Sequence, residues 1–100
     1  MSAHRHTHYL LHGTKHTSID VFYADAKYVF NFPDYFGNNL DAFEECLRET
    51  VERIQVPIHI EWKDAYSAKH HLGSSWNDIV EIIVDVLHNY APKESALILK

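Results

Sequence analysis

Apolar residues recur every three or four positions in segments 19–30 and 40–54 of this 100-residue chain, the spacing that gathers them on one face of a helix. A first helix is predicted over about residues 19–31, after a capping hydroxyl and carboxylate in segment 17–20. Pro33 ends it, because the residue before a proline avoids helical backbone angles. Asn39 is a good N-terminal cap for a second helix. The apolar stripe of that helix occupies about 80° of arc and consists of Leu40, Phe43, Leu47, Val51 and Ile54.

Two further helices are predicted in the second half of the chain. One, over about residues 63–72, is short and ends at Gly73. The other begins near Ser75 and Asp78, whose spacing is typical of a capping pair, and its helical apolar spacing continues to Tyr90. The apolar face of this fourth helix is wide, so we expect neighbouring elements to bury it.

Three short segments rich in apolar side chains predict strands at 9–12, 57–62 and 95–99, and the middle one is also rich in β-branched residues. The last is a continuous apolar run, which is typical of a parallel strand covered on both faces. Helices separate each strand from the next, and a helical crossover returns the chain in the same direction. The chain therefore predicts an α/β fold in which about four helices cover a three-stranded parallel sheet.

The composition agrees with one folded unit. Hydrophobic residues make up 46% of the sequence and charged residues 23%, which suits one core in a chain too short for two. We expect residues 9–100 to form this domain and the His-rich segment 1–8 to be disordered. The single cysteine, Cys46, cannot form an internal disulfide and is expected in the core. No apolar run is long enough for a membrane span or a secretory signal, so we expect a cytoplasmic location.

Negative charge is concentrated in one segment. Residues 34–52 hold six acidic residues and one base, Arg48, whereas the remaining residues hold eight of each, so the formal net charge of −5 arises in this segment. Such a patch repels phosphate backbones, which disfavours direct binding to nucleic acid and favours a basic protein partner.

The second predicted helix displays two of these acids together. With Leu40 set at 0° on a helical wheel, Asp41 falls at about 100° and Glu45 at about 140°, both on the exposed face. Like charges four residues apart destabilise an isolated helix by a few tenths of a kcal/mol. Such pairs are also common on exposed helix faces that contribute only to solubility. In the preceding turn, Phe36 is the better core candidate, which leaves Tyr35 exposed beside the acids. An exposed tyrosine next to paired carboxylates is typical of a protein interface.

The loop and the second helix also carry a recognisable motif. The string Tyr35-Phe36-Gly37-Asn38-Asn39-Leu40-Asp41-Ala42, followed by Cys46-Leu47, resembles the signature of the barstar family, intracellular inhibitors of the bacterial ribonuclease barnase. The similarity continues at Pro57 and at Glu61-Trp62 and extends over about residues 9–100. The resemblance implies a three-stranded parallel sheet covered by helices, the same order that the apolar spacing predicts.

The resemblance also implies a function. The acidic helix and the preceding loop would plug the active site of a bacterial ribonuclease, an extracellular-type or toxin enzyme with a basic cleft, and carboxylates would occupy its phosphate-binding positions. We expect such an inhibitor to be a monomer without a cofactor. The partner-binding residues that the resemblance implies are Tyr35, Gly37, Asn39, Asp41, Glu44, Glu45 and Asp85.

Two positions depart from the family pattern and bear on the identity of the target. Glu45 stands where the family has a shorter aspartate, and one added methylene displaces a carboxylate by about an ångström, the scale that matters in such contacts. Glu44 stands where the better-known member has tryptophan, so an aromatic anchor is replaced by charge. We therefore expect the inhibitory mode, but not necessarily inhibition of barnase itself.

Three alternatives stay open at this stage. Asp41 and Glu45 are candidates for an acid and base pair in an enzyme, although they lie on one convex helix face without a nucleophile or glycine-rich motif. Alternating histidines at His4, His6 and His8 are able to hold a transition metal weakly. The third alternative is an interaction module that keeps the fold and binds a partner other than a ribonuclease.

Overall fold

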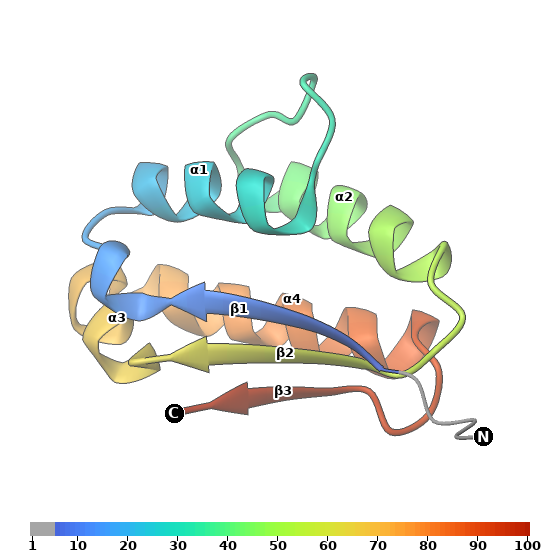
Figure 1. The fold of residues 1–100 in the computed structure, drawn as a ribbon. Coiled ribbons are helices and arrows are strands. Elements are labelled where there is room, and N and C mark those ends of the chain that lie inside the picture. Colours follow the sequence, from blue (N-terminus) through green and yellow to red (C-terminus); the bar gives the residue numbers. More distant parts are fainter. Residues whose placement is uncertain (1–5) are drawn as a thin grey trace.

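The computed structural model describes residues 6–100 (Figure 1), and its elements alternate as the sequence predicts. The strands are β1 (Thr7–His12), β2 (Ile58–Lys63) and β3 (Ala96–Leu99). The helices are α1 (Ile19–Phe30), α2 (Leu40–Glu52), α3 (Ala65–Leu72) and α4 (Ser74–Tyr90), and a 3-10 turn, η1 (Gly13–Lys15), follows β1.

The three strands form one parallel sheet in the order β1-β2-β3, and their arrows point the same way in Figure 1. In this register Tyr9 lies beside Ile60, and Ile60 lies beside Leu97. The predicted α/β class and the three-stranded parallel sheet are therefore confirmed.

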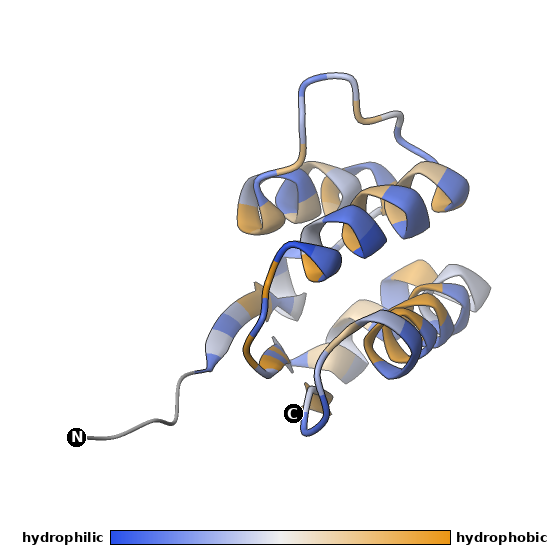
Figure 2. Ribbon diagram, turned by 90° about the vertical axis from the view of Figure 1, so that its right-hand side faces the viewer, coloured by the Kyte–Doolittle hydropathy of each residue, from blue (hydrophilic) through white to orange (hydrophobic). Residues whose placement is uncertain are grey.

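Helices cover one face of the sheet and leave the other open. Leu11, Ile60 and Trp62 point to the covered face and are buried, whereas Leu10 and Ile98 point to the opposite face and are exposed. The prediction that the last strand is covered on both faces is wrong, because β3 is an edge strand of a two-layer structure. Along the helices, hydrophilic and hydrophobic residues alternate, as Figure 2 shows, and this pattern suits elements with one buried side.

Aromatic side chains hold the helical layer on the sheet. The ring centroid of Phe22, on α1, lies 5.4 Å from that of Trp62 on β2 and 5.5 Å from that of Phe43 on α2. All three residues are fully buried. Contacts of this kind add to the free energy of burying the rings and fix how α1 and α2 sit on the sheet.

Several boundaries differ from the prediction. Strand β1 begins at Thr7, so Thr7 and His8 belong to the sheet and not to a disordered segment, and the backbone N–H of Thr7 donates to the carbonyl of Pro57 at 2.9 Å. His6, directly before the strand, is also described and is exposed, whereas residues 1–5 lie outside the described residues.

The expected capping pair of the fourth helix is also wrong. Helix α4 starts at Ser74 directly after Gly73, and neither Ser75 nor Asp78 supplies a cap, because α3 and α4 share this single residue as their junction. Gly73 adopts φ 58°, a left-handed backbone that favours glycine. Within residues 6–100, α4 and the other helices all lack the combined length and apolarity of a membrane span.

Candidate functional site

The loop between α1 and α2 is anchored by two buried aromatic residues. Phe32 and Phe36 are buried and their ring centroids lie 5.0 Å apart, and the Phe36 ring also lies 6.0 Å from that of Tyr23 on α1. Asn31, with φ 56°, turns the chain out of α1. In Figure 1 this loop stands out beyond both helices. Its two anchors hold a projecting loop in one place.

Gly37 and Asn39 shape the start of α2. The side-chain oxygen of Asn39 accepts a hydrogen bond from the backbone N–H of Ala42 at 2.8 Å, so the predicted cap is confirmed. The backbone N–H of Asn39 donates to the carbonyl of Gly37 at 2.8 Å. A methyl group added to Gly37 would lie 3.3 Å from the Asn39 side-chain nitrogen, so the two residues fit closely.

The buried face of α2 is rotated from the predicted stripe. Cys46 and Thr50, which the stripe omits, are buried, whereas Leu40 and Ile54, which it includes, are only half-buried. The Thr50 hydroxyl donates to the carbonyl of Cys46 at 2.8 Å, which lets a polar residue lie inside. Burial raises the pKa of the Cys46 thiol, with smaller contributions from Glu49 and Glu45, as suits an inert core cysteine.

The rotation turns the acidic side chains of α2 toward solvent. Asp41, Glu44 and Glu45 are exposed, and Glu49, one turn beyond Glu45, is half-exposed. Asp41, Glu45 and Glu49 are spaced four residues apart, which places them in one row along the helix. We call the exposed side of α2 that carries Asp41, Glu44, Glu45 and Glu49 the acidic face. The sequence prediction of the partner-binding residues omitted Glu49. The four-residue spacing between Glu45 and Glu49 was the signal that would have included it.

Tyr35 lies beside this acidic face. Its side chain is 74% exposed, whereas Phe36 is 7% exposed, so the predicted division of the two rings is confirmed. The Glu49 carboxylate raises the pKa of the Tyr35 hydroxyl, and slight desolvation, Cys46 and Glu45 raise it further, against a lowering by Arg53. The phenol is therefore within electrostatic range of Glu49 and Glu45, and the exposed side of the loop adjoins the acidic face.

The other flank of α2 packs against α4. The guanidinium carbon of Arg48 lies 5.7 Å from the ring centroid of Tyr90 at the end of α4, a cation–π distance. The one base of the acidic segment is thus directed to a neighbouring helix. Asp85 is exposed on α4, so it belongs to a different element from the other predicted site residues.

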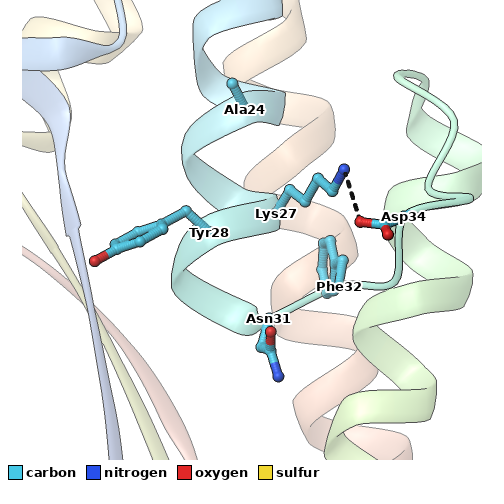
Figure 3. Close-up of a pocket in the computed structure, with 6 residues that line it drawn as sticks. All are labelled: Ala24, Lys27, Tyr28, Asn31, Phe32 and Asp34. Carbon is cyan, nitrogen blue, oxygen red and sulfur yellow. Dashed lines mark ion pairs between the residues drawn. The ribbon is translucent and has the colours of Figure 1, made fainter.

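A shallow depression lies on the α1 side of the loop (Figure 3). Lys27 and Asp34 line it and face one another there, with Nζ 3.6 Å from Oδ1. Asp34 is fully exposed, so the pair contributes little to stability. The other lining residues are Ala24, Tyr28, Asn31 and Phe32. This depression marks the base of the loop, and its one acid and one base already pair with each other.

Histidines also gather away from the acidic face. His4 lies outside the described residues, but His6 and His8 meet His59 of β2 on the open face of the sheet. The predicted set of His4, His6 and His8 therefore lacked His59, because only the fold brings His59 close to His6 and His8.

The comparisons with known proteins agree with this geometry. Residues 6–100 match the family model described as Barstar (barnase inhibitor). Over 74 residues the chain is also 34% identical to a Bacillus subtilis (strain 168) protein named "Putative ribonuclease inhibitor YrdF", and the match covers 74% of this chain and 78% of that protein. Because the family match includes the sheet, the loop and the acidic face, the chain belongs to the barstar family.

Proposed function

We propose that this protein inhibits a bacterial ribonuclease by covering its active site with the acidic face of α2 and the Tyr35 loop. The observation that carries the proposal is the row of carboxylates at Asp41, Glu45 and Glu49, exposed beside a 74% exposed tyrosine on an anchored loop. Like charges along one row disfavour the isolated helix, so a partner with positive charge would relieve their repulsion.

The chemistry of a ribonuclease cleft fits this surface. An enzyme that binds an RNA backbone presents cationic side chains to successive phosphates, and a row of carboxylates offers the same sign of charge at comparable spacing. The excess of five negative charges in residues 34–52 would also steer a cationic enzyme toward this side of the molecule. Tyr35 would add apolar contact area beside the charges at low entropic cost.

The family supports inhibition in general. The family description names an inhibitor of barnase, and the Bacillus subtilis relative is named a ribonuclease inhibitor. The identity of the enzyme depends on residues peculiar to this chain. Glu44 and Glu45 are both exposed, so both are available to a partner, and we propose that they direct the protein to a ribonuclease other than barnase.

The direct test is a titration against a panel of bacterial ribonucleases, both secreted enzymes and toxins, with RNA cleavage as the readout. We expect stoichiometric inhibition of one enzyme at a ratio of one to one. Glu45→Gln and Asp41→Asn should weaken this inhibition by tenfold or more. Glu94→Gln is the matched control, because it removes one exposed negative charge from the α4–β3 turn, outside the acidic face, with the same isosteric change.

Other results would favour the alternatives. Tight binding of a cellular protein that is not a ribonuclease, lost in Asp41→Asn, would favour an interaction module with a new partner. Turnover of RNA by the purified protein itself would favour an enzyme. The cytoplasmic location and the monomeric state expected from the sequence stay predictions, as does the contribution of Asp85 to the interface.

A further inference from the structure

Histidines from two strands meet on the open face of the sheet. His6 and His8 are two residues apart, and side chains two apart on an extended chain point to the same side. His59 on β2 is the register partner of His8 on β1. The parallel pairing therefore brings a third imidazole next to two that the sequence already places together.

The three rings are close enough to share one ion. The ring centroid of His59 lies 4.6 Å from that of His6 and 5.2 Å from that of His8. One ligand nitrogen from each ring lies within 4.8 Å of the other two. A tetrahedral ion with bonds of about 2.0–2.1 Å separates its ligand nitrogens by about 3.3 Å. Small side-chain rotations close that difference, because His6 and His8 are exposed and free to turn.

A hydrogen bond holds the His59 ring in the tautomer that a metal ligand needs. Its Nε2 lies 3.1 Å from the backbone carbonyl of Glu94, and since a carbonyl only accepts, Nε2 carries the proton and donates. In the neutral ring Nδ1 then keeps its lone pair. Metal-bound histidines commonly donate their other ring N–H to a carbonyl in this way, which fixes the tautomer and the ring orientation.

We propose that His6, His8 and His59 form a binding site for a divalent transition ion, with Zn²⁺ as the representative. Imidazole nitrogen suits Zn²⁺, Ni²⁺ and Cu²⁺, whereas Mg²⁺ and Ca²⁺ prefer oxygen ligands. Three histidines leave a fourth position for water or for a group from another molecule. The ion would tie the start of the edge strand β1 to the central strand β2. This site is separate from the acidic face and does not depend on the inhibition proposed above.

The test is calorimetric titration of the full chain with ZnCl₂, together with the visible absorption of bound Co²⁺ and thermal unfolding with and without Zn²⁺. We expect one ion per chain, a Co²⁺ spectrum of nitrogen ligands, and a Zn²⁺-dependent rise in Tm. His59→Ala and His8→Gln should each weaken binding at least tenfold and remove the rise in Tm. Because two separate ligands are tested, reduced folding of one variant leaves the other to decide.

A control variant separates this site from unspecific binding. His12→Gln removes a histidine from the same strand and the same face of the sheet, but its register partner is Lys63, a cation that disfavours an ion there. We expect His12→Gln to bind Zn²⁺ as the unaltered chain does. The proposal is overturned if His59→Ala keeps full affinity, since the ion would then be held by the N-terminal histidines alone, or if His12→Gln loses as much affinity as His59→Ala.

Discussion

Trp62 donates its indole N–H to Nδ1 of His16 across 3.1 Å, inside the fully buried core. On the opposite side of the same ring, Nε2 lies 2.7 Å from Oδ2 of Asp25 on α1. Since Nδ1 accepts, the proton of the neutral ring is on Nε2 and is donated to Asp25. One buried imidazole therefore joins the central strand to the first helix, and both of its nitrogens have partners.

This arrangement predicts that stability depends on pH. Burial lowers the pKa of His16, and the hydrogen bond and charge of Asp25 oppose that shift without reversing it. Because the folded pKa is below the unfolded value of about 6.5, the unfolded chain binds more protons as pH falls. The His16 contribution to stability is complete above about pH 6.5 and is lost as pH falls toward the folded pKa, by at most about 1.4 kcal/mol per pH unit.

Urea unfolding between pH 7.5 and pH 5 measures the slope, and NMR titration of the His16 ring locates the group responsible. We expect the ring of His16 to titrate below about pH 6.5. A midpoint above that value would instead indicate a charged His16 paired with Asp25, and the proposed sign of the pH dependence would be wrong.

The order of elements was predictable because helix and strand periods are local properties of the sequence. The extent of β1 was not, because Thr7 and His8 are polar residues that join the sheet only by pairing with Ile58 and His59 of β2, which are distant in the sequence. The exposure of β3 was missed for a related reason. An apolar run such as 96–99 shows that a strand has a face to bury, and only the packing of other elements decides whether the second face is covered.

The exposure of Asp41, Glu45 and Tyr35 was predictable, because it follows from one helix and the turn before it. Residues that meet through the fold were not. His16 follows a polar turn and carries no local signal of burial, yet it is enclosed by Trp62 and Phe22. His59 joins His6 and His8 only through the register of the sheet. Local spacing thus predicts faces of single elements, and contacts between elements need the structure.

Gly13 should be the least replaceable glycine among those in the described chain. A Cβ atom at this position would lie 2.1 Å from the carbonyl oxygen of Asp64 and 2.8 Å from that of Lys63, and backbone atoms cannot move aside cheaply. We expect Gly13→Ala to lower the free energy of unfolding by about 2 kcal/mol or more. In Gly37→Ala the Cβ would lie 3.3 Å from the end of the Asn39 side chain, so the free energy of unfolding should fall by less in the same denaturation experiment. Equal losses would contradict this account.

Asn39 should contribute to stability through its cap, whatever it contributes to binding. Its side chain accepts from the N–H of Ala42, so Asn39→Ala leaves that donor without this partner and should cost about 1 kcal/mol. Asn39→Ser keeps a capping oxygen and should recover most of the loss. The comparison is made by chemical denaturation. An unchanged midpoint in Asn39→Ala would show that water replaces the cap without cost.

Glu45 and Asp41 should separate stability from binding. Glu45 lies between Asp41 and Glu49 in one row, so Glu45→Gln removes two repulsive pairs and should leave the domain equally stable or more stable by a few tenths of a kcal/mol. Asp41 is in the first turn, where a negative charge interacts favourably with the helix dipole, so Asp41→Asn should cost about 0.5 kcal/mol. Both variants should weaken inhibition of the target ribonuclease, because each should reduce the free energy of binding by about 2–5 kcal/mol. Marked unfolding of Glu45→Gln would assign the acid a structural role.

The charge of segment 34–52 should act mainly on the rate of association. Exposed charges interact over about 30 Å at 0.01 M salt and about 3 Å at 1 M, so salt should remove long-range attraction before it disrupts contacts at short range. Stopped-flow mixing with the target ribonuclease should show the association rate constant falling about tenfold or more between these conditions, and the dissociation rate changing much less. The double variant Asp41→Asn, Glu45→Gln should show a shallower dependence, because it has fewer charges to screen. An association rate that does not respond to salt would contradict steering by this segment, even if the complex were tight, and would leave shape and the Tyr35 contact as the source of affinity.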